Sequence, residues 1–341
     1  MQNEIVTLQP LHDEKGHLVN PGYAKKMLFE YNRKRIKAAG FKIKEWDYYL
    51  INNEDYGIAF TIADNSYLGF VSVSLLDFKK KTYEMFSTMK AFTFGKFNMP
   101  STSVQGDVHY KDKKIELSFL NDGTTRKIIC KIAKFKKRVP LTAEINLTNA
   151  PEESMVISTP FKKNKKAFYF NQKLNCMQAD GTVQYGDQTI EFKDAYGVLD
   201  WGRGVWTYDN TWFWGTASGK HKGKPFGFNI GYGFGDLSNA TENMIFYDGK
   251  AHKFDKITFQ IPRNRSELEF LEEWKLVSND GRFNMTFTPI LDRADKIDIL
   301  LIVSDQHQVF GKLNGYVELD DGTTLKIKDL LGSAEVVHNR W

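Results

Sequence analysis

Short segments of alternating apolar and polar residues, joined by tight turns, fill most of this chain. Two of the turns are nearly identical, "LNDGTTRKI" at 120–128 and "LDDGTTLKI" at 319–327, and "YKDKKIEL" at 110–117 has the same shape as "YGDQTIEF" at 185–192. Asp-Gly is a favoured pair in tight hairpin turns, so these segments predict β-hairpins. Hairpin after hairpin predicts an all-β protein built from antiparallel barrels or sandwiches.

The repeats also bear on domain organisation. Each pair places one copy in each half of the chain, which fits either a duplicated β-domain or convergence on the same turn chemistry. A chain of 341 residues is long for a single core. We therefore expect two domains, residues 1–150 and residues 151–341, with a boundary near "TNAPEES" at 148–154.

Helical signals are few. A helix is predicted near residues 21–39, where Asn20 suits the N-cap, Pro21 suits the first turn and Gly40 suits the C-terminal end. The segment "SELEFLEEWKLV" at 266–277 predicts either a second short helix or an alternating strand. The fold expected is therefore all-β with one or two short helices.

Charge gives little support for a nucleic-acid partner. The net charge is only +5, and the basic runs at 131–138 and 162–166 lie beside no recognisable nucleic-acid-binding motif. Such runs are typical of a solvated surface, with a polyanion or a peripheral membrane contact as the alternative. No apolar run approaches the ~20 residues of a membrane helix, and the N-terminus lacks a secretory signal, so a cytoplasmic location is expected.

Metal and cofactor signals are also absent from the sequence. Cys130 and Cys176 are too few for a disulfide framework or a tetrahedral metal site, and the seven histidines do not cluster with carboxylates. We expect no metal and no cofactor.

The stretch "YGVLDWGRGVWTYDNTWFWGTASG", residues 196–219, holds four of the seven tryptophans. If Gly202 and Gly204 bend the chain, Arg203 can be turned against the carboxylate of Asp200. One interpretation is a structural Arg–Asp strut beneath a tryptophan core, and the other is a carboxylate with a shifted pKa in an aromatic pocket. The second interpretation predicts ligand-binding roles for Trp201, Arg203, Trp206, Tyr208, Trp212 and Trp214.

Other polar residues lie among apolar neighbours. Glu242 and Asn243 precede the segment "MIFYDG", and His307 follows an apolar run. We expect Asp200, Glu242 and His307 as candidate catalytic groups and Asn243 as a ligand contact, although a lone histidine after a core strand is more often structural.

Three glycines, Gly231, Gly233 and Gly235, alternate with a period of two in "GFNIGYGFGD". Small residues on one face of a strand leave room for a bulky neighbour or for a ligand. Asp47 and Asp64, by contrast, are typical of ordinary strand-end and turn residues.

Seven segments and the chain terminus carry a resemblance to a known family. They are "LVNPGYA" (18–24), "KEWDYYLI" (44–51), "FTIADNSYLGFVSVSLLDF" (60–78), the tryptophan-rich block, "TENMIFYDGKAHK" (241–253), "FTPILDR" (287–293), "HQVFGKLNGYV" (307–317) and the terminal Arg340-Trp341. Over nearly its full length the chain resembles the bacterial domain-of-unknown-function 2804 (DUF2804) family. In many relatives we would expect Phe in place of Trp201 and Pro in place of Thr207, and both departures are mild.

The resemblance implies no established activity and no catalytic residues. It implies an architecture similar to the two-lipocalin-domain folds of carotenoid hydratase and tocopherol cyclase relatives. Fold alone does not fix function. In that architecture the aromatic block would fill a barrel mouth or the contact between barrels, where small-molecule sites often lie.

Three functions follow as hypotheses. The first is binding of a hydrophobic small molecule, lipid-like or isoprenoid-like, in an aromatic pocket between or within barrels. The second is an enzyme, either a cofactor-free lyase, hydratase or cyclase with Asp200 as the acid, or a glycoside-active enzyme that pairs Asp200 with Glu242. The third is a structural module with every aromatic side chain buried. The sequence leaves a peripheral membrane contact and the oligomeric state open.

Overall fold

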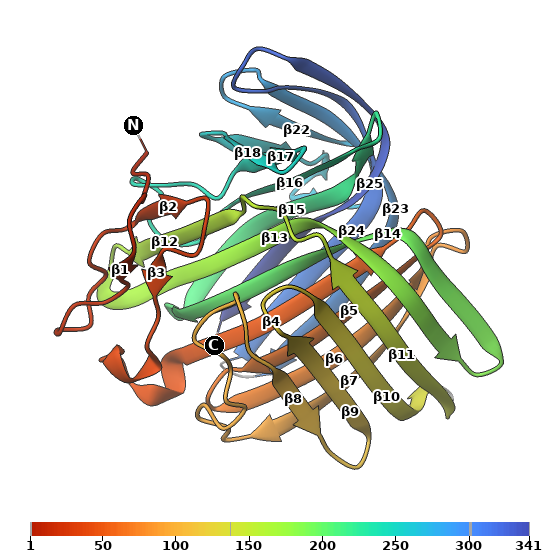
Figure 1. Ribbon diagram of the computed structural model, residues 1–341, viewed down its shortest axis with the longest axis horizontal. Helices are drawn as coiled ribbons and strands as arrows, with labels where there is room; N and C mark the ends of the chain where they lie inside the picture. The colour runs from red at the N-terminus through yellow and green to blue at the C-terminus, as the bar shows by residue number, and fades with distance from the viewer. Residues whose placement is uncertain (1, 137, 300–301, 341) are drawn as a thin grey trace.

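The computed structural model describes residues 2–136, 138–299 and 302–340, and it consists of two large curled antiparallel sheets (Figure 1). Trp341 of the terminal pair and Leu300 and Leu301 of the apolar run before His307 lie outside the described residues. Helical structure in the described ranges is confined to two single-turn 3-10 helices, η1 (Arg33–Arg35) and η2 (Gly40–Lys42). The prediction of an all-β, lipocalin-like fold is confirmed.

The first sheet has twelve strands. In hydrogen-bonded order its main path is β7 (Thr82–Ala91), β6 (Leu68–Asp77), β5 (Tyr56–Asp64), β4 (Ile43–Asn52), β14 (Gln188–Val205), β13 (Asn164–Tyr185), β11 (Val139–Thr148), β10 (Arg126–Lys136), β9 (Ile115–Asn121) and β8 (Val108–Lys111). Beside this path, one end of β13 also pairs with β12 (Met155–Phe161), which pairs with β2 (Gly22–Ala24).

The second sheet has nine strands. Its order is β18 (Lys250–Lys253), β17 (Met244–Tyr247), β16 (Lys224–Tyr232), β15 (Asp209–His221), β25 (Thr324–Arg340), β24 (Ile302–Glu318), β23 (Phe283–Ile299), β22 (Trp274–Ser278) and β19 (Ile257–Gln260). Two small pairs complete the fold, the parallel β1 (Gln9–Pro10) with β3 (Phe29–Glu30) and the antiparallel β20 (Arg263–Asn264) with β21 (Glu267–Leu268).

All four repeated turn segments form the hairpins that their sequences predict. The Asp-Gly turns connect β9 to β10 and β24 to β25, and the other two segments connect β8 to β9 and β13 to β14. The β13–β14 hairpin lies in the first sheet together with its partner sequence, so that pair does not supply one copy to each sheet. Strands β12 to β14 continue the first sheet, and the chain changes sheet between Val205 and Asp209. The division into domains at residues 150 and 151 stays a prediction.

The predicted helix over residues 21–39 is wrong. This segment forms β2, β3 and η1, because Gly22–Ala24 pairs with β12 and so satisfies its backbone in a sheet. Asn32 caps only the short η1, accepting from the backbone N–H of Lys34 at 2.9 Å. In "SELEFLEEWKLV" the strand alternative is right, since β21 and the start of β22 lie there.

The two sheets pack against each other through β13 and β14 of the first and β15 and β16 of the second, near the middle of Figure 1. Asn175 Nδ2 donates to the carbonyl of Phe228 at 2.9 Å, and the N–H of Cys176 donates to Ser218 Oγ at 3.0 Å. We call the layer of side chains between the two sheets the seam. No helix within the described residues is long and apolar enough to span a bilayer.

Candidate functional site

Strand β14 points Asp200 and Arg203 to opposite faces of the first sheet. Pairing with β13 and β4 is regular from Leu199 to Val205, so side chains alternate and an odd separation places two residues on different sides. The predicted pair between Asp200 and Arg203 is therefore wrong, and each side chain has other partners.

Arg203 belongs to a buried ion cluster inside the first sheet. Its Nη1 donates to Asp47 Oδ1 at 3.0 Å, and its Nε lies 4.0 Å from Glu45 Oε1. Glu45 also accepts from Tyr31 Oη at 2.7 Å and from Arg33 Nη1 at 2.5 Å. Three backbone carbonyls accept from the same guanidinium. This is the structural strut of the first interpretation, with Asp47 and Glu45 in place of Asp200.

Trp201 lies on this face as well. Its ring is 4.0 Å from the Arg203 guanidinium carbon and packs edge-on against Phe170, with ring centroids 5.4 Å apart. The side chain is 1% exposed. Trp201 and Arg203, both predicted to bind a ligand, are therefore packed in the core of the first sheet.

Asp200 faces the seam and holds a buried lysine. Lys173 Nζ lies 2.6 Å from Asp200 Oδ2, while Asn171 Nδ2 and Trp46 Nε1 donate to Oδ1 at 2.7 and 3.1 Å. The Lys173 side chain is only 2% exposed, and its ammonium lies 4.1 Å from the ring centre of Trp214. Both oxygens of Asp200 are thus occupied as acceptors.

The glycines of the tryptophan-rich block make room for indoles. A Cβ at Gly202 would lie 2.0 Å from Cζ2 of Trp46, and one at Gly204 would lie 2.9 Å from Nε1 of Trp206. Both positions lie in the regular part of β14, so the glycines do not bend the chain as expected. They let two indole rings lie directly on the sheet, and Trp46 reaches Asp200 from there.

Glu242 enters the seam from the second half of the chain. It is fully buried, and its Oε2 accepts from Tyr169 Oη at 3.1 Å. Burial raises the pKa of Glu242 to about 7; the charge of Lys173 opposes the shift and that of Asp200 adds to it. In the part of the chain that the structure describes, Oε1 of Glu242 has no hydrogen-bond partner.

Gly231 makes space for this carboxyl group, since a Cβ there would lie 2.4 Å from Glu242 Oε1. Of the three glycines expected to alternate along one strand face, only Gly231 lies on β16. Gly233 and Gly235 follow β16 in a turn, with φ of 99° and 80°.

Aromatic rings surround the polar groups. The Trp206 ring contacts Trp46, Tyr169, Trp212 and Phe234 at centroid separations of 6.1, 5.7, 5.1 and 6.2 Å. Trp206 Nε1 and Asn171 Oδ1 are buried without a partner among the described residues, as is Oε1 of Glu242. A buried polar atom left unpaired costs about 1–3 kcal/mol, so these three atoms lower the stability of this part of the seam.

A third carboxyl group, on Glu335, lies at the edge of this cluster. Glu335 accepts from Trp212 Nε1 at 3.0 Å and from Gln308 Nε2 at 3.2 Å, and Tyr48 Oη donates to Gln308 Oε1 at 3.3 Å. Burial raises the pKa of Glu335, and Lys173 and Asp200 act on it with opposite signs. Asp200, Glu242 and Glu335 therefore share the field of one buried lysine.

Three predicted site residues lie elsewhere. Asn243 joins strand to loop, accepting from the N–H of Gly231 at 2.8 Å and donating to the carbonyl of Asp255 at 2.8 Å. Tyr208 lies between β14 and β15 and is 49% exposed. His307 and Gln308 point to opposite faces of β24, and only Gln308 faces the seam.

His307 has its own surroundings on the far face of the second sheet. Its Nδ1 lies 2.7 Å from Asp292 Oδ2, and its ring stacks on Phe270 with centroids 3.8 Å apart. The structure therefore brings Asp200 and Glu242 into one site, with Trp206, Trp212 and Trp214, and leaves His307 outside it.

Sequence reasoning missed the polar row on β13. Tyr169, Asn171, Lys173 and Asn175 alternate in "YFNQKLN", a pattern typical of a strand with one solvated face. The second sheet covers that face instead, and all four residues are buried. Trp46 and Glu335 were also missed. Trp46 lies in "KEWDYY", residues 44–49, where charged and aromatic residues alternate in part.

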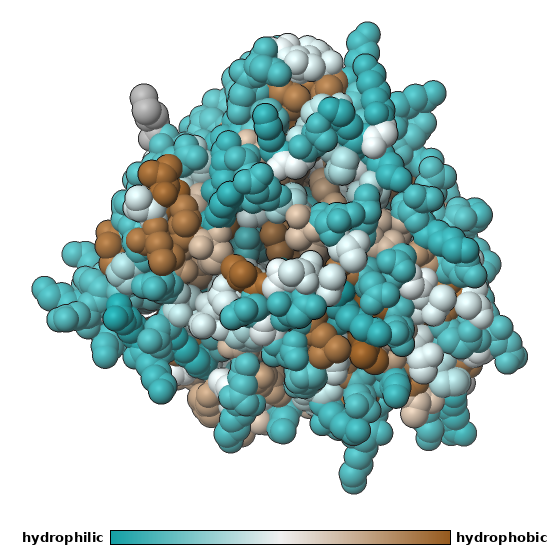
Figure 2. Space-filling view, in the orientation of Figure 1, coloured by the Kyte–Doolittle hydropathy of each residue, from teal (hydrophilic) through white to brown (hydrophobic). Residues whose placement is uncertain are grey.

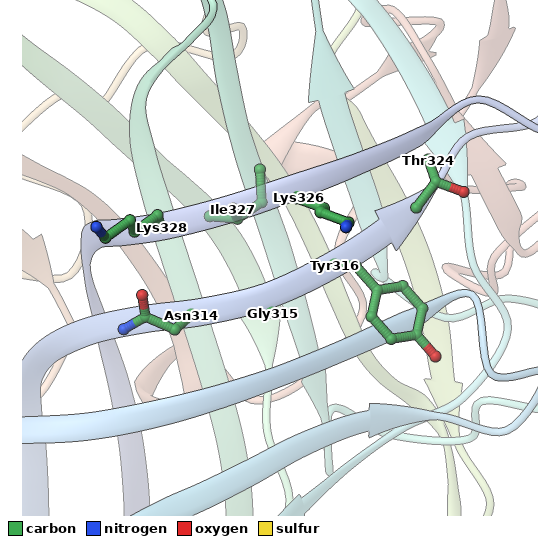
Figure 3. A pocket seen from close by; sticks show the side chains of 7 residues that line it. All are labelled: Asn314, Gly315, Tyr316, Thr324, Lys326, Ile327 and Lys328. Atoms are coloured by element: carbon green, nitrogen blue, oxygen red, sulfur yellow. The ribbon is translucent and has the colours of Figure 1, made fainter.

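An open hollow lies away from the seam. It measures about 680 Å³, and Figure 3 shows that its lining side chains all come from the β24–β25 hairpin. None of the predicted site residues lines it. Within residues 2–136, 138–299 and 302–340, no group of three His, Cys, Asp or Glu side chains could hold a metal ion.

Comparisons with known proteins bear on fold and family. A crystal structure from Nitrosomonas europaea, provisionally named AttH, is similar with a TM-score of 0.55 and 13% identity, covering 88% of this chain and 93% of that chain. Kievitone hydratase from Nectria haematococca gives a TM-score of 0.46 and 11% identity, covering 87% and 88%. At such identities the first likeness shows the fold alone. None of the curated proteins compared with the chain matches it.

The family comparison covers almost every residue. The profile of DUF2804, described as a domain of unknown function, matches residues 2–341. The two-sheet fold and the tryptophan-rich block that carried the resemblance lie within this range, and the chain belongs to the DUF2804 family.

Proposed function

We propose that this protein binds a small, mostly apolar molecule, ring-shaped or unsaturated, at the seam between its two sheets. The observation that carries the proposal is the set of three unpaired polar atoms, on Glu242, Asn171 and Trp206, buried inside an aromatic layer. A ligand with one hydroxyl or carbonyl group would pair with these atoms, and its hydrocarbon part would pack on the indoles of Trp46 and Trp212. A lipid or an isoprenoid-like compound has this chemistry.

Binding is tested with delipidated protein and retinol, which carries a ring, a polyene and one hydroxyl group. Energy transfer from tryptophan to retinol would report occupancy. Trp206→Phe removes the unpaired N–H in the seam and should weaken binding about five- to tenfold. Trp274→Phe makes the same change in the core of the second sheet, where Nε1 donates to the Phe270 carbonyl at 3.2 Å, and should not alter the affinity.

Native mass spectrometry of freshly purified protein supplies the complementary test. A co-purifying apolar molecule would support the proposal and identify the ligand class. Protein that carries no such molecule and binds no retinol contradicts it, and so does equal loss of affinity in both tryptophan variants.

A second candidate function is acid catalysis on the bound molecule. It is favoured by Glu242, whose raised pKa of about 7 keeps a proton on the carboxyl group near neutral pH and whose Oε1 is unpaired. Asp200 suits this role less well than expected, because both of its oxygens already accept hydrogen bonds. The glycoside-active alternative stays a prediction, as does the cytoplasmic location.

The chemistry would be an addition to a carbon–carbon double bond. The Glu242 proton moves to one carbon, the cation that forms on the other is stabilised by indole faces by about 0.5–2 kcal/mol each, and water adds through its oxygen. The proton released from that water returns to the Glu242 carboxylate, so the acid is regenerated. The reverse sequence is a dehydration.

The step is tested by incubating the protein with retinol in heavy water and measuring deuterium bound to carbon. Incorporation is expected for the wild type and for His307→Gln, and it should vanish in Glu242→Gln. Incorporation that survives Glu242→Gln removes this acid from the proposal. Retinol that binds without exchange leaves binding as the function.

A further inference from the structure

One end of the first sheet exposes aromatic side chains on rigid backbone. Phe41 in η2 and Phe92 and Phe94 after β7 are 51%, 66% and 50% exposed. The rings of Phe92 and Phe94 lie nearly parallel, with centroids 6.3 Å apart. Exposed phenylalanines gathered at one end of a molecule mark an interaction surface more often than isolated ones do.

The loop that carries them is firmly held. The N–H groups of Phe92 and Phe94 donate to the carbonyls of Tyr67 and Ser66 at 2.9 Å each. Between them Thr93 points inward, and its hydroxyl donates to Asp64 Oδ1 at 2.7 Å. Asp64 is fully buried, so it anchors this loop and is no ordinary turn residue. The exposure of the two phenylalanines is therefore built into the fold.

Phe92 and Phe94 also have left-handed backbone, with φ of 56° and 47°. A bulky residue in this region is strained, and the strain persists only where the surrounding structure enforces it. Asn or Gly would fit this backbone better and would expose less apolar surface. Two phenylalanines thus occupy positions where both the backbone and the solvent disfavour them.

Basic residues surround these rings. Ser66 ties the segments together, since its Oγ donates to the Ile43 carbonyl and accepts from Arg33 Nη2. We define the aromatic rim as Phe41, Phe92 and Phe94 with the exposed lysines Lys42, Lys90 and Lys96.

Acidic residues in the same stretches, 31–45, 64–68 and 90–99, are limited to Glu45 and Asp64, both buried. Outside these stretches, the exposed Asp112 accepts from the hydroxyl of Thr88 at 3.3 Å, on the strand β7 that leads to Lys90. The three exposed lysines of the rim outnumber this carboxylate, so the rim presents net positive charge to solvent.

We propose that the aromatic rim docks this protein onto a membrane surface that contains anionic lipids. Phenylalanine rings at the interface gain by leaving water, and lysines beside them are attracted to the lipid phosphates. Each lysine close to an anionic surface raises the binding constant about fivefold. The inference is independent of the seam, although an apolar seam ligand would itself partition into such a membrane.

A second apolar patch provides the control. Figure 2 shows hydrophobic residues gathered over the N-terminal segment that carries β1 to β3. Val6 and Leu8 there are 75% and 64% exposed, but residues 2–14 contain no lysine or arginine. Residues 2–14 thus supply apolar surface without basic residues of their own, and Lys25 and Lys26 farther along the segment are paired with Glu153 and Glu152.

The test is flotation of the full-length protein with vesicles of phosphatidylcholine alone or mixed with phosphatidylglycerol. The wild type should float with the mixed vesicles, and sodium chloride should weaken the binding. The double variant Phe92→Asn/Phe94→Asn should lose at least about tenfold in the partition coefficient while remaining as resistant to urea as the wild type, because Asn suits left-handed backbone. The control Val6→Ser/Leu8→Ser should bind like the wild type.

Four outcomes would overturn the proposal. They are no flotation with the mixed vesicles, equal flotation with both kinds of vesicle, full binding by the asparagine variant, and an equal loss in the control. Sedimentation velocity tests whether a second copy of this chain covers the rim instead. A wild-type dimer that becomes monomeric in the asparagine variant would make the rim an interface between two copies and would contradict membrane docking.

Discussion

The two faces of β14 bury charge in different ways. On the inner face, Arg203 lies between Asp47 and Glu45, and Glu45 takes further hydrogen bonds from Tyr31 and Arg33. On the seam face, three carboxyl groups share one buried lysine, and two of the acceptor atoms there, Glu242 Oε1 and Asn171 Oδ1, are unpaired among the described residues. Arg203 Nε and Trp201 Nε1 are unpaired donors on the inner face, and Trp206 Nε1 is an unpaired donor in the seam.

This difference separates a structural role from the proposed binding role. A buried ion pair contributes little net stability, but removing one partner strongly destabilises the fold. The Arg203 cluster therefore fixes how β4 and β14 pack. An unpaired buried donor or acceptor lowers stability on either face, and among the described residues only the seam places unpaired acceptors beside a carboxyl group whose pKa is raised. Both arrangements come from residues only three positions apart.

The sharpest way to break the comparison is to remove each cation in turn. Arg203→Met should lower the free energy of unfolding by about 3–5 kcal/mol, since it leaves the buried carboxyl group of Asp47 without the arginine that pairs with it, while Glu45 keeps Arg33. Lys173→Met should lower it less, because Asp200 keeps its hydrogen bonds from Asn171 and Trp46. Urea unfolding at neutral pH measures both. An equal loss of unfolding free energy in the two variants would mean that the two faces of β14 depend on their buried cations to the same extent.

The sequence predicts the hairpins well because Asp-Gly turns act locally. It also points to Asp200, Glu242 and three seam tryptophans, since tryptophan density and a carboxylate among apolar residues are visible without a structure. The Asp200–Arg203 pair failed because an odd spacing on a regular strand separates faces. Lys173 and Asn171 were missed because their face of β13 is buried only by contact with the second sheet, and the sequence does not show that contact.

The pH dependence of stability tests the seam face next. The pKa of Glu242 rises from 4.5 to about 7 on folding, chiefly through burial. Below pH 4.5 the carboxyl group is protonated in both states, and between these values only the unfolded chain releases the proton. Unfolding therefore becomes easier as pH rises, by about 3 kcal/mol once the pH exceeds 7.

Glu242→Gln cannot ionise and should lack this decline. Urea unfolding of both proteins from pH 5 to pH 8 gives the comparison, and the curve of the variant should be the flatter one. Parallel curves would show that Glu242 does not titrate in the folded seam, which would remove the basis for its role as an acid.

Gly202→Ala probes the contact between the strand and its indole. The new methyl group would meet Trp46 at 2.0 Å, so the ring must move and its hydrogen bond to Asp200 should break. We expect a loss of about 2 kcal/mol in the free energy of unfolding and a shift in tryptophan emission. Gly40→Ala is the matched control, because no described atom lies within 4 Å of its Cβ. An unchanged emission spectrum in Gly202→Ala would contradict the placement of Trp46.

The smallest change in stability is expected for a substitution at His307, and this substitution also tests whether the binding site ends at the seam. His307 contacts Asp292 on the far face of the second sheet, and their side chains are 27% and 15% exposed. Replacing it by Gln should cost about 1 kcal/mol of stability, the usual contribution of one partly buried hydrogen bond. Retinol affinity should not change, because alternation along β24 sends only Gln308 toward the seam. If His307→Gln weakens retinol binding as much as Trp206→Phe does, the binding site extends through the second sheet. In that case the strand face on which a buried polar residue lies does not determine whether that residue contributes to ligand binding.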